Sequence, residues 1–411
     1  MKLRPLLSWV LFLLPAGGWF LWSFILTDRS LLYSSSSIFL VFQNFWWQFA
    51  DVRPAVTIIY LILVGALFCL YGVIFKKLQN STSLKMRHII LPLGIFFLFF
   101  VLSNPALSYD LFNYIFDAKL VIHYHLDPHA TSAILFSGTD DWVRFMRNVF
   151  FPTTYGYMWT ALSLIPFVVG LGKFLLVFIS FKLFMLLGLC LLFLLQRKMG
   201  GKLQSLALFF VSPLVLLEAL SSGHNDIWMM LLAFASLAIL FPRKGKDSLL
   251  VVVGKVTLSF ILLYASSEVK RSTALLLPVW GTLAGGLFMQ FISVPVLIKR
   301  LYGWVRTWWA DLCALLLFAP LFTELSRQFN PWYLVWPLSF LPFVKSKIIK
   351  IFLICFSLTS LLRYVPILYI GVYSPSLEMT QKVITWSALP LGIIICGALF
   401  LFRKSKMKKR I

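Results

Sequence analysis

Apolar runs long enough to cross a membrane recur along almost the whole chain, and this feature constrains the fold most. A helix needs about 20 residues to cross the hydrocarbon core of a bilayer. With 60% hydrophobic and 12% charged residues, the chain leaves no polar half that could form a separate soluble domain. A water-soluble fold would have to bury more apolar area than one core accommodates. The sequence therefore predicts a single all-α, polytopic membrane domain over residues 1–411.

We expect about twelve membrane spans, one for each apolar run of sufficient length. They cover residues 6–26, 55–75, 89–103, 173–195, 203–219, 226–241, 249–266, 273–297, 308–323, 332–344, 351–370 and 381–402. Basic residues recur in alternate connections, at 76–88, 197–202, 242–246, 299–306, 345–350 and 403–410. Cytoplasmic loops are enriched in Lys and Arg, so we place these connections and both termini in the cytoplasm. The net charge of +23 then indicates topology and contact with anionic membrane lipids rather than with nucleic acid.

The longest polar segment, residues 104–172, consequently faces outward. Residues 155–170 within it are apolar but short, and a crossing there would break the alternation of charge between the two sides. We expect them to form an interfacial helix, so that residues 104–172 make a large extracytoplasmic loop carrying interfacial helices.

The outward loop begins with SYDLFNY, residues 108–114. Ser108 is placed to cap a helix, which puts Asp110 at the second helical position and aligns Asp110, Tyr114 and Asp117 on one helical face. Such an acid often only complements the helix dipole. Asp110, however, lies a few residues beyond a span, near the depth where lipid headgroups meet water. A carboxylate there can act as a general base on a hydroxyl that attacks a lipid-borne sugar.

The same loop continues with HYHLDPH, which places His123, His125, Asp127 and His129 at alternate positions. In an extended strand these side chains would project to one side, as metal ligands do. Asp127 followed by proline is also typical of a turn, and histidines near headgroups often serve only as hydrogen-bonding groups. A divalent metal is therefore possible here, but the sequence requires no metal and no other cofactor.

A second outward cluster is EALSSGHNDIWMM, residues 218–230, in which SSGHND forms a short turn. Asn225 or Asp226 is placed to cap the following helix. Capping gives no role to His224, and the acids Glu218 and Asp226 beside it are costly at a membrane surface unless they have partners. We therefore predict that His224 and Asp226 belong to a functional site.

A third outward cluster, RQFNPWYLVWPL at 327–338, combines Arg327 and Gln328 with Trp332 and Tyr333. The aromatic side chains are equally typical of an ordinary interfacial belt. Arg327, the cation of this cluster, can bind a lipid phosphate. It can also stabilise the negative charge that the phosphate gains when its bond to the sugar breaks.

Three further cations, Lys270, Arg271 and Arg363, are in positions that need a functional or structural explanation. Lys270 and Arg271 occupy an outward turn, SSEVKRST, where they can hold a phosphate or serve as solvated anchors. Arg363 lies inside the eleventh expected span. A charge within the membrane is costly, so Arg363 needs a partner or a wet cavity.

Four motifs follow one another along the chain: SYDLFNY at 108–114, PTTYGYMW at 152–159, GHND at 223–226 and NPWYLVWP at 330–337. As an ordered set they resemble the GT-C membrane glycosyltransferases. More narrowly, they are similar to the bacterial polyprenyl-phosphate-mannose-dependent alpha-mannosyltransferases of the actinobacterial lipoglycan type, and more distantly to the GPI mannosyltransferases. The resemblance covers residues 89–340. This chain departs from the family pattern in two ways. Two expected spans precede the span that comes first in the simplest members of the family. In addition, HLDPH replaces the commoner Asn-Pro-Tyr turn, and this second departure leaves the identity of the sugar open.

The resemblance implies a GT-C-like bundle whose first large outward loop carries the catalytic aspartate, which matches Asp110. It also implies a lipid-phosphate sugar donor and inversion at the sugar carbon. The GHND match would place His224, Asn225 and Asp226 at the active cleft, with Trp332 and Tyr333 beside the donor. Further substrate-binding candidates are Tyr109, Asn113, Tyr114 and Tyr155 in the matching motifs, and Asp117 on the same helical face as Asp110.

The sequence thus predicts an enzyme of the bacterial cell membrane, a hexosyltransferase that moves mannose or a related sugar from polyprenyl phosphate to an extracytoplasmic glycan or glycolipid. The sequence contains no Gly-rich phosphate cradle for a nucleotide sugar, which agrees with a lipid-linked donor. The alternatives are a transporter or flippase of lipids or sugars, for which ionisable pairs inside the spans are expected, and a surface-glycan polymerase or ligase.

Overall fold

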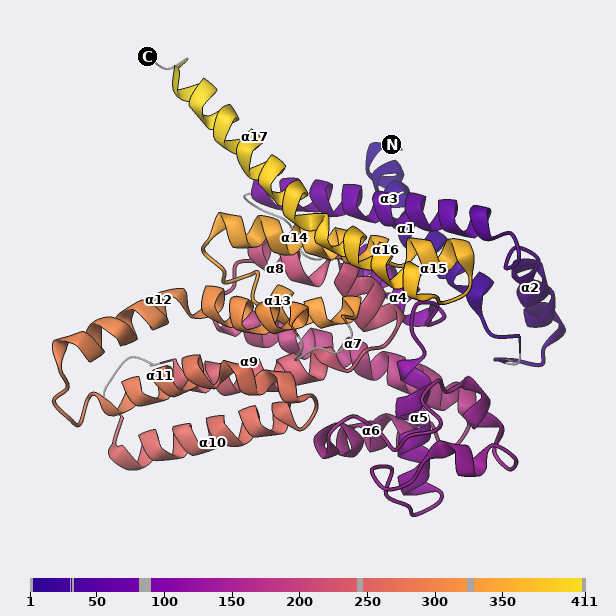
Figure 1. The fold of residues 1–411 in the computed structure, drawn as a ribbon, viewed down its shortest axis with the longest axis horizontal. Helices are drawn as coiled ribbons and strands as arrows, with labels where there is room; N and C mark the ends of the chain where they lie inside the picture. The colour runs from indigo at the N-terminus through magenta and orange to yellow at the C-terminus, as the bar shows by residue number, and fades with distance from the viewer. Residues whose placement is uncertain are drawn as a thin grey trace.

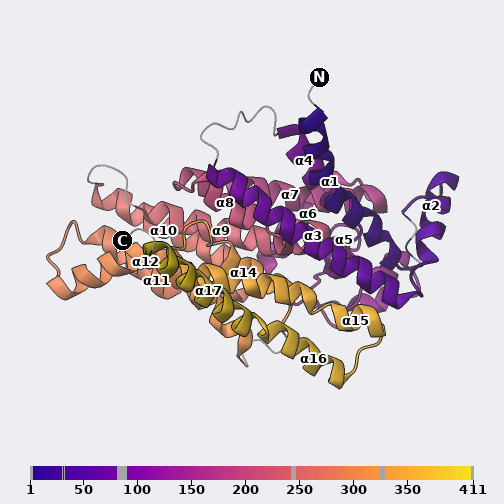
Figure 2. The same cartoon turned by 90° about the horizontal axis from the view of Figure 1, so that it is seen from above.

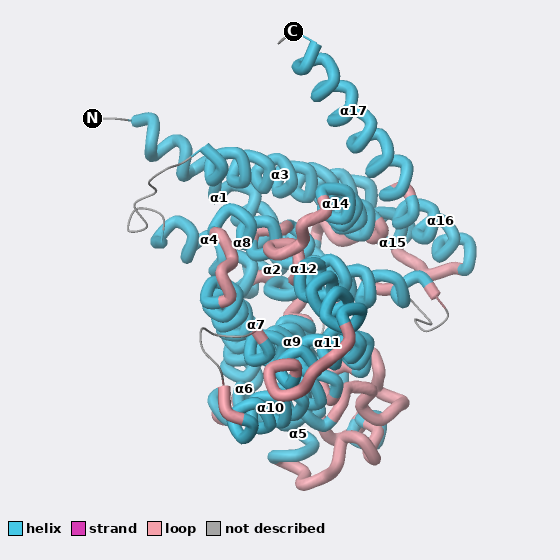
Figure 3. Tube along the Cα trace, turned by 90° about the vertical axis from the view of Figure 1, so that its left-hand side faces the viewer, coloured by secondary structure: helices cyan, strands magenta, loops and turns pink. Residues whose placement is uncertain are grey.

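A computed structural model describes residues 3–29, 31, 33–80, 90–241, 247–323 and 329–408 of the chain. Helices connected by loops and turns make up these residues, and no strand occurs among them (Figures 1 and 3). The predicted all-α fold is therefore confirmed. Figure 2 shows α3 and α14 running obliquely side by side across one face of the molecule.

The amino-terminal half contains helices α1 Leu3–Ser23, η1 Phe24–Leu26, α2 Ser37–Trp47, α3 Arg53–Asn80, α4 Ile90–Leu102, α5 Asp110–Ile122, η3 Ala133–Phe136, η4 Asp141–Phe145, α6 Tyr157–Val169, α7 Phe174–Lys198, α8 Leu203–Phe210 and η5 Val215–Ser221. The carboxyl-terminal half contains α9 Asp226–Leu240, α10 Leu249–Ser267, η6 Arg271–Leu276, α11 Leu277–Phe288, α12 Val296–Phe318, η7 Ala319–Phe322, η8 Pro331–Leu334, α13 Val335–Leu338, α14 Lys347–Leu362, α15 Val365–Ile370, α16 Pro375–Trp386 and α17 Ala388–Lys408.

Six helical segments in the described part of the chain are long and apolar enough to cross a membrane. They are Arg53–Leu78, Phe174–Lys198, Leu249–Ser267, Val296–Phe322, Lys347–Ile370 and Pro375–Leu401. Five of them match an expected span closely. The sixth, Val296–Phe322, contains the expected span 308–323 but begins before it, so residues 299–306 are helical and do not form the expected cytoplasmic connection. Four of the other expected spans correspond to shorter apolar helices or to a broken one, so the number of about twelve crossings stays a prediction.

Two expected spans are not continuous helices. In the segment 273–297, α11 ends at Phe288 and α12 begins only after Pro295. The segment 332–344 forms only η8 and the four-residue helix α13 before it turns. Pro337 and Pro342 lie inside it, and each lacks the N–H that a continuing helix would need. Proline therefore outweighs the apolar composition in the segment 332–344.

One apolar segment is a broken helix. Leu203–Phe210 and Val215–Ser221 are bent by 64° relative to each other, with Pro213 at the break. The second piece, η5, is a π-helix, a form that is rare and frequent at functional sites. Its last residue, Ser221, is held by Trp19 from α1 and by Ser103, which follows directly after α4, at 2.8 and 2.6 Å. The turn SSGHND begins on this fixed end.

The segment 104–172 forms the unit around α5 and α6 at the lower right of Figure 1. Residues 157–169 form the expected short helix, α6, which packs against α5, and its interfacial position stays a prediction. Gly156 precedes α6 and approaches the turn after α10 so closely that an added Cβ would lie 2.0 Å from the Glu268 carbonyl oxygen. Its N–H donates to the Val269 carbonyl at 3.5 Å. This contact joins the α5–α6 unit to the turn that carries Lys270.

Candidate active site

Asp110 is the first residue of α5, one position earlier in the helix than predicted. Tyr109 rather than Ser108 occupies the N-cap position and makes no side-chain cap. The Ser108 hydroxyl instead accepts a hydrogen bond from the Asp110 N–H at 3.3 Å. The carboxylate of Asp110 is 19% exposed, so it lies at the edge of the protein interior rather than inside it.

His224 is completely buried, and the local backbone explains how it comes to face Asp110. Gly223 has φ +76°, a conformation that favours glycine and that reverses the chain immediately before the imidazole. The His224 N–H then donates to the carbonyl of Glu218 at 3.2 Å, closing the end of the π-helix. The turn therefore returns His224 to the helix that carries Glu218.

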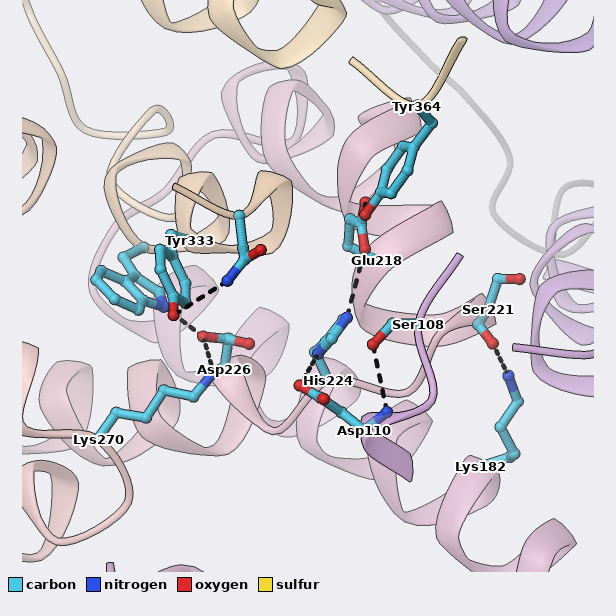
Figure 4. Close-up of polar contacts among 12 residues, drawn as sticks. Ser108, Asp110, Lys182, Glu218, Ser221, His224, Asp226, Lys270, Tyr333 and Tyr364 are labelled. Atoms are coloured by element: carbon cyan, nitrogen blue, oxygen red, sulfur yellow. Dashed lines mark hydrogen bonds and ion pairs between the residues drawn. The ribbon is translucent and has the colours of Figure 1, made fainter. Parts of the chain in front are cut away.

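Asp110, His224 and Glu218 form a row, which we call the carboxylate–imidazole array (Figure 4). Asp110 Oδ2 lies 3.4 Å from His224 Nδ1, and Glu218 Oε2 lies 3.5 Å from His224 Nε2. The Tyr364 hydroxyl donates to the other oxygen of Glu218 at 2.9 Å. The Trp332 ring stacks on the imidazole with centroids 4.1 Å apart. The imidazole ring of His224 is thus contacted on its two edges by Asp110 and Glu218 and on one face by Trp332.

The array changes the acidity of its members. Burial by itself raises the pKa of Asp110, but hydrogen bonding to His224 and the charges of His224 and Lys270 bring the pKa below its ordinary value. Burial by itself lowers the pKa of His224, but hydrogen bonds and charge from Asp110 and Glu218 bring the pKa above its ordinary value. Both effects favour an ionised Asp110 beside an imidazolium.

Asp226 belongs to a neighbouring cluster. Its side chain is completely buried, and Oδ1 accepts from Lys270 Nζ at 2.7 Å and from the Trp336 indole N–H (Figure 4). Tyr333 stacks on Trp336 with centroids 4.7 Å apart, and the Lys270 ammonium lies 5.7 Å from the Tyr333 ring centre. Lys270, which the sequence assigned to phosphate, therefore has an ion-pair partner inside the protein.

Several buried polar atoms around the turn have no hydrogen-bond partner among the described residues. They are Oε2 of Glu218, Oγ of Ser222, both ring nitrogens of His224, both amide atoms of Asn225, Oδ2 of Asp226 and the hydroxyl of Tyr114. The contacts of His224 with Asp110 and Glu218, at 3.4 and 3.5 Å, are therefore ion contacts rather than well-formed hydrogen bonds. Asn225 stands at the N-cap position of α9, yet its side chain makes no cap, so the predicted capping role is wrong in this respect. Unpaired polar groups are costly in a protein interior, so their concentration here indicates a place that takes water or a ligand.

Tyr114 and Tyr155 link this turn to α5. The two rings meet edge to face, with centroids 4.7 Å apart. Burial raises the pKa of both hydroxyls, and the negative charge of Asp110 adds to the effect. Both tyrosines therefore stay protonated beside Asp110, where they can donate hydrogen bonds.

The remaining candidates lie apart from the array. Asn113 accepts from the Arg147 N–H at 3.4 Å, and the Arg147 guanidinium lies 4.3 Å from the Tyr109 ring centre. Asp117 is buried, which raises its pKa to about 7. Arg271 is exposed at the start of η6. Arg327 and Gln328 lie outside the described residues.

The HYHLDPH segment does not form the extended strand that a row of metal ligands would need. After α5 ends at Ile122 the chain makes turns, with His125 at φ +56°. The His129 ring stacks on Tyr157 at 3.8 Å and contacts the Thr160 hydroxyl at 3.0 Å. In the described part of the chain, no group of three or more His, Cys, Asp and Glu side chains is arranged to hold a metal ion.

The sequence did not predict three contributors. Glu218 was noted only as a neighbour of His224, and neither Tyr364 nor the buried Lys182 was singled out. The Lys182 ammonium donates to the carbonyls of Leu220 and Ser221 at the end of the π-helix (Figure 4). A lysine inside the apolar run 174–195 was the available signal, because a charge within a membrane helix needs a partner.

One comparison with known proteins gives a match. A family model described as alpha-(1->6)-mannopyranosyltransferase, N-terminal domain, matches residues 28–286, more than half of the 411 residues. This match confirms the resemblance that the four motifs predicted. Searches of curated proteins and of solved structures returned no match. The matched region contains Asp110, His224 and Lys270 and ends before Trp332 and Tyr364.

Proposed function

The chain belongs to the alpha-(1->6)-mannopyranosyltransferase family, and from this premise we propose that it transfers mannose from a polyprenyl-phosphate donor to a hydroxyl of a glycan or glycolipid outside the cytoplasm. The family name supports mannose and a (1→6) linkage. Helices apolar enough to cross a membrane support a donor and a reaction at the membrane surface. The basic loops support an active site on the extracytoplasmic side.

The carboxylate–imidazole array carries the proposal. Its only member with an exposed side chain is Asp110, at 19%, whereas His224 and Glu218 are at 0%. A substrate therefore reaches Asp110 first, and the other two act through it. An ionised carboxylate at such an edge can accept a proton, and Tyr155 and Tyr114 beside it can orient the incoming hydroxyl.

In the proposed reaction Asp110 acts as general base. The acceptor hydroxyl gives its proton to the Asp110 carboxylate while its oxygen forms a bond to the anomeric carbon of mannose. The bond between that carbon and the phosphate oxygen breaks, and the electron pair leaves with polyprenyl phosphate. Attack opposite to the leaving group inverts the configuration. General-base catalysis of this kind contributes about 10²- to 10⁴-fold in rate.

His224 and Glu218 are proposed as positioning residues for Asp110. The imidazolium faces Asp110 on one edge and Glu218 on the other, and its positive charge favours an ionised Asp110. Asp226 is proposed to hold Lys270, whose positive charge also favours the ionised form of Asp110. Asn225, whose amide atoms have no described partner, is proposed to bind substrate.

The test is transfer of labelled mannose from polyprenyl phosphate in membranes containing Asp110→Asn. We expect a loss of about 10²- to 10⁴-fold with unchanged protein level and thermal stability. Asp141→Asn is the matched control, because Asp141 lies in the same loop and forms an exposed pair with Arg144 at 2.6 Å. Near-wild-type turnover of Asp110→Asn would overturn the proposal.

The same assay separates the alternatives. A transporter or flippase would move the lipid-linked sugar between leaflets without forming a covalent product. A polymerase or ligase would give products of many lengths on a gel, whereas a single-sugar transferase adds one mannose. Reporter fusions at residues 104–172 test the side of the membrane: a cytoplasmic signal would contradict the proposed topology.

A further inference from the structure

Lys182 is a buried lysine in the middle of α7, a helix that is long and apolar enough to cross a membrane. Its side chain is 1% exposed. The ammonium donates to the backbone carbonyl of Leu220 at 2.6 Å and to that of Ser221, so its contacts are with backbone oxygens rather than with a carboxylate. A cation inside a membrane helix is costly, and its partners therefore indicate what it is for.

The two acceptors are the last carbonyls of the π-helix η5, which ends at Ser221. The last carbonyls of a helix have no N–H partner within the helix, and they carry the negative end of the helix dipole. A lysine ammonium complements this charge and satisfies such carbonyls at the same time. Lys182 thus acts as a side-chain cap for η5, supplied by a different helix.

The turn that carries His224 begins at this capped end. His224 follows Ser221 by three residues, and its Nδ1 lies 3.4 Å from Asp110 Oδ2. Between them, Gly223 approaches α5 so closely that an added Cβ would lie 3.1 Å from Leu111 Cδ1. The connection from η5 to the imidazole is therefore short and packed against the helix that carries Asp110. A shift at the end of η5 would move the imidazole relative to the proposed base.

The other contacts at the end of η5 hold a side chain and not the backbone. Trp19 donates to the Ser221 hydroxyl at 2.8 Å, and the Ser103 hydroxyl lies 2.6 Å from it. These contacts leave the direction of the two carbonyls open, whereas the Lys182 ammonium fixes both. In Figure 4 Lys182 reaches Ser221, and no dashed line joins it to a member of the carboxylate–imidazole array.

We propose that Lys182 is a positioning residue for the proposed reaction: by holding the last two carbonyls of η5, it sets the position of His224 relative to Asp110. The inference rests on the proposed function, because it gives Lys182 a part in that reaction. Lys182 is buried and acts through the turn alone. Placement of catalytic groups is a sensitive quantity, since an error of about 1 Å can lower a rate by about 10²-fold.

The test compares mannose transfer by Lys182→Met and by the wild type, with the full-length proteins in nanodiscs. Methionine keeps an unbranched apolar side chain but donates no hydrogen bond. We expect kcat to fall by about ten- to hundredfold because the turn loses its fixed end. The KM for the polyprenyl-phosphate donor should stay within about twofold, because Lys182 does not bind the donor. A kcat equal to that of the wild type would overturn the proposal.

Two control variants lie on the same helix. Lys173 is an exposed lysine at the N-cap position of α7, so Lys173→Met should transfer mannose at the wild-type rate. Met185 is completely buried one turn after Lys182, so Met185→Ala removes interior packing without touching the turn. If Met185→Ala lowers kcat as much as Lys182→Met does, at an equal loss of melting temperature, the effect is general destabilisation and the proposal is wrong.

A double-mutant cycle separates action through His224 from an independent structural role. In a His224→Gln background the imidazole is already absent, so adding Lys182→Met should lower kcat by less than about threefold. Independent roles would instead multiply the two losses, and this result would overturn the proposal.

Lys182→Gln serves the same cycle if the methionine variant does not fold. Its amide nitrogen is one bond short of the place of the ammonium, so kcat should fall by at least about fivefold in the wild-type background and by much less beside His224→Gln. Equal losses in both backgrounds would contradict the proposal. An active Asp110→Asn would defeat the proposed reaction and this inference with it, whereas an inactive Asp110→Asn beside a fully active Lys182→Met would defeat this inference alone.

Discussion

Two polar segments that carry histidines, HYHLDPH at 123–129 and SSGHND at 221–226, lie in different surroundings. In the first, His123, His125 and Asp127 are exposed. Asp127 accepts from the His129 N–H at 2.9 Å and from the Tyr157 hydroxyl at 3.4 Å. The polar groups of segment 123–129 are thus either hydrogen-bonded within the loop or accessible to water. Ordinary turn chemistry is enough to explain why they occur there.

In the second segment every residue is buried. His224 faces two carboxylates, and both amide atoms of Asn225 have no partner among the described residues. Exposed polar groups cost little, whereas unpaired buried ones cost much. The comparison teaches that burial without local satisfaction, and not the density of histidines in the sequence, separates a candidate reaction centre from an ordinary surface loop.

The largest expected effect tests this comparison directly. His224→Gln should lower the rate of mannose transfer by about 10²-fold, because Asp110 loses the cation that keeps it ionised and oriented. His129→Gln should leave the rate within about twofold, since the His129 ring contacts Tyr157 and Thr160 and no member of the array. Both rates are measured in membranes with matched protein levels. Equal losses in the two variants would remove the distinction between the segments.

A smaller effect, of about tenfold, is expected for Glu218→Gln, and it has a pH signature. His224 is faced by Asp110 from α5, by Glu218 from η5 and by the uncharged Trp332 ring from η8. The two carboxylates raise the pKa of His224, so the imidazolium is present below this raised value and is lost as the pH rises through it.

Replacing the Glu218 carboxylate by an amide removes one of these two charges and lowers the pKa of His224. The alkaline limb of the profile of kcat against pH should therefore move to lower pH in Glu218→Gln. A reduced rate with an unmoved alkaline limb would show that Glu218 supports the fold but not the charge of His224.

The smallest effect concerns the contact between the α5–α6 unit and the Lys270 turn. Gly156→Ala places a Cβ 2.0 Å from the Glu268 carbonyl oxygen, and backbone cannot move aside cheaply. We expect a loss of about 1–3 kcal/mol in stability, measured by thermal unfolding in detergent, with a fewfold loss of transfer. Gly138→Ala, where an added Cβ meets open space in the same loop, is the control. Equal melting temperatures would mean that the two regions are not coupled through this contact.

The sequence predicted a large part of the fold because apolar length and composition act locally. Five expected spans match membrane-length helices, a sixth forms the second part of a longer helix, and the short helix expected within residues 155–170 is present as α6. The prediction of continuous spans was wrong for the segments 273–297 and 332–344, where proline and turns interrupt apolar runs. Arg363 was expected to need a partner or a cavity, and the structure gives it little compensation among the described residues.

The candidate site was predictable in its residue types and not in its geometry. Asp110 and His224 stood out because polar groups are rare in this chain. Glu218 and Tyr364 could not be connected to them, because the Glu218–Tyr364 hydrogen bond joins residues 146 positions apart. Asp226 and Lys270 were both singled out, yet their ion pair with each other was not expected.

By itself, the sequence determined that this is a helical membrane protein and which few polar side chains it has to accommodate. Transfer of apolar surface out of water depends on composition and periodicity, which are local and can be counted along the chain. The tertiary structure alone decided which carboxylate faces which imidazole, since hydrogen bonds and charge pairs act over a few ångströms and depend on how the π-helix, α5 and the turn between α14 and α15 meet.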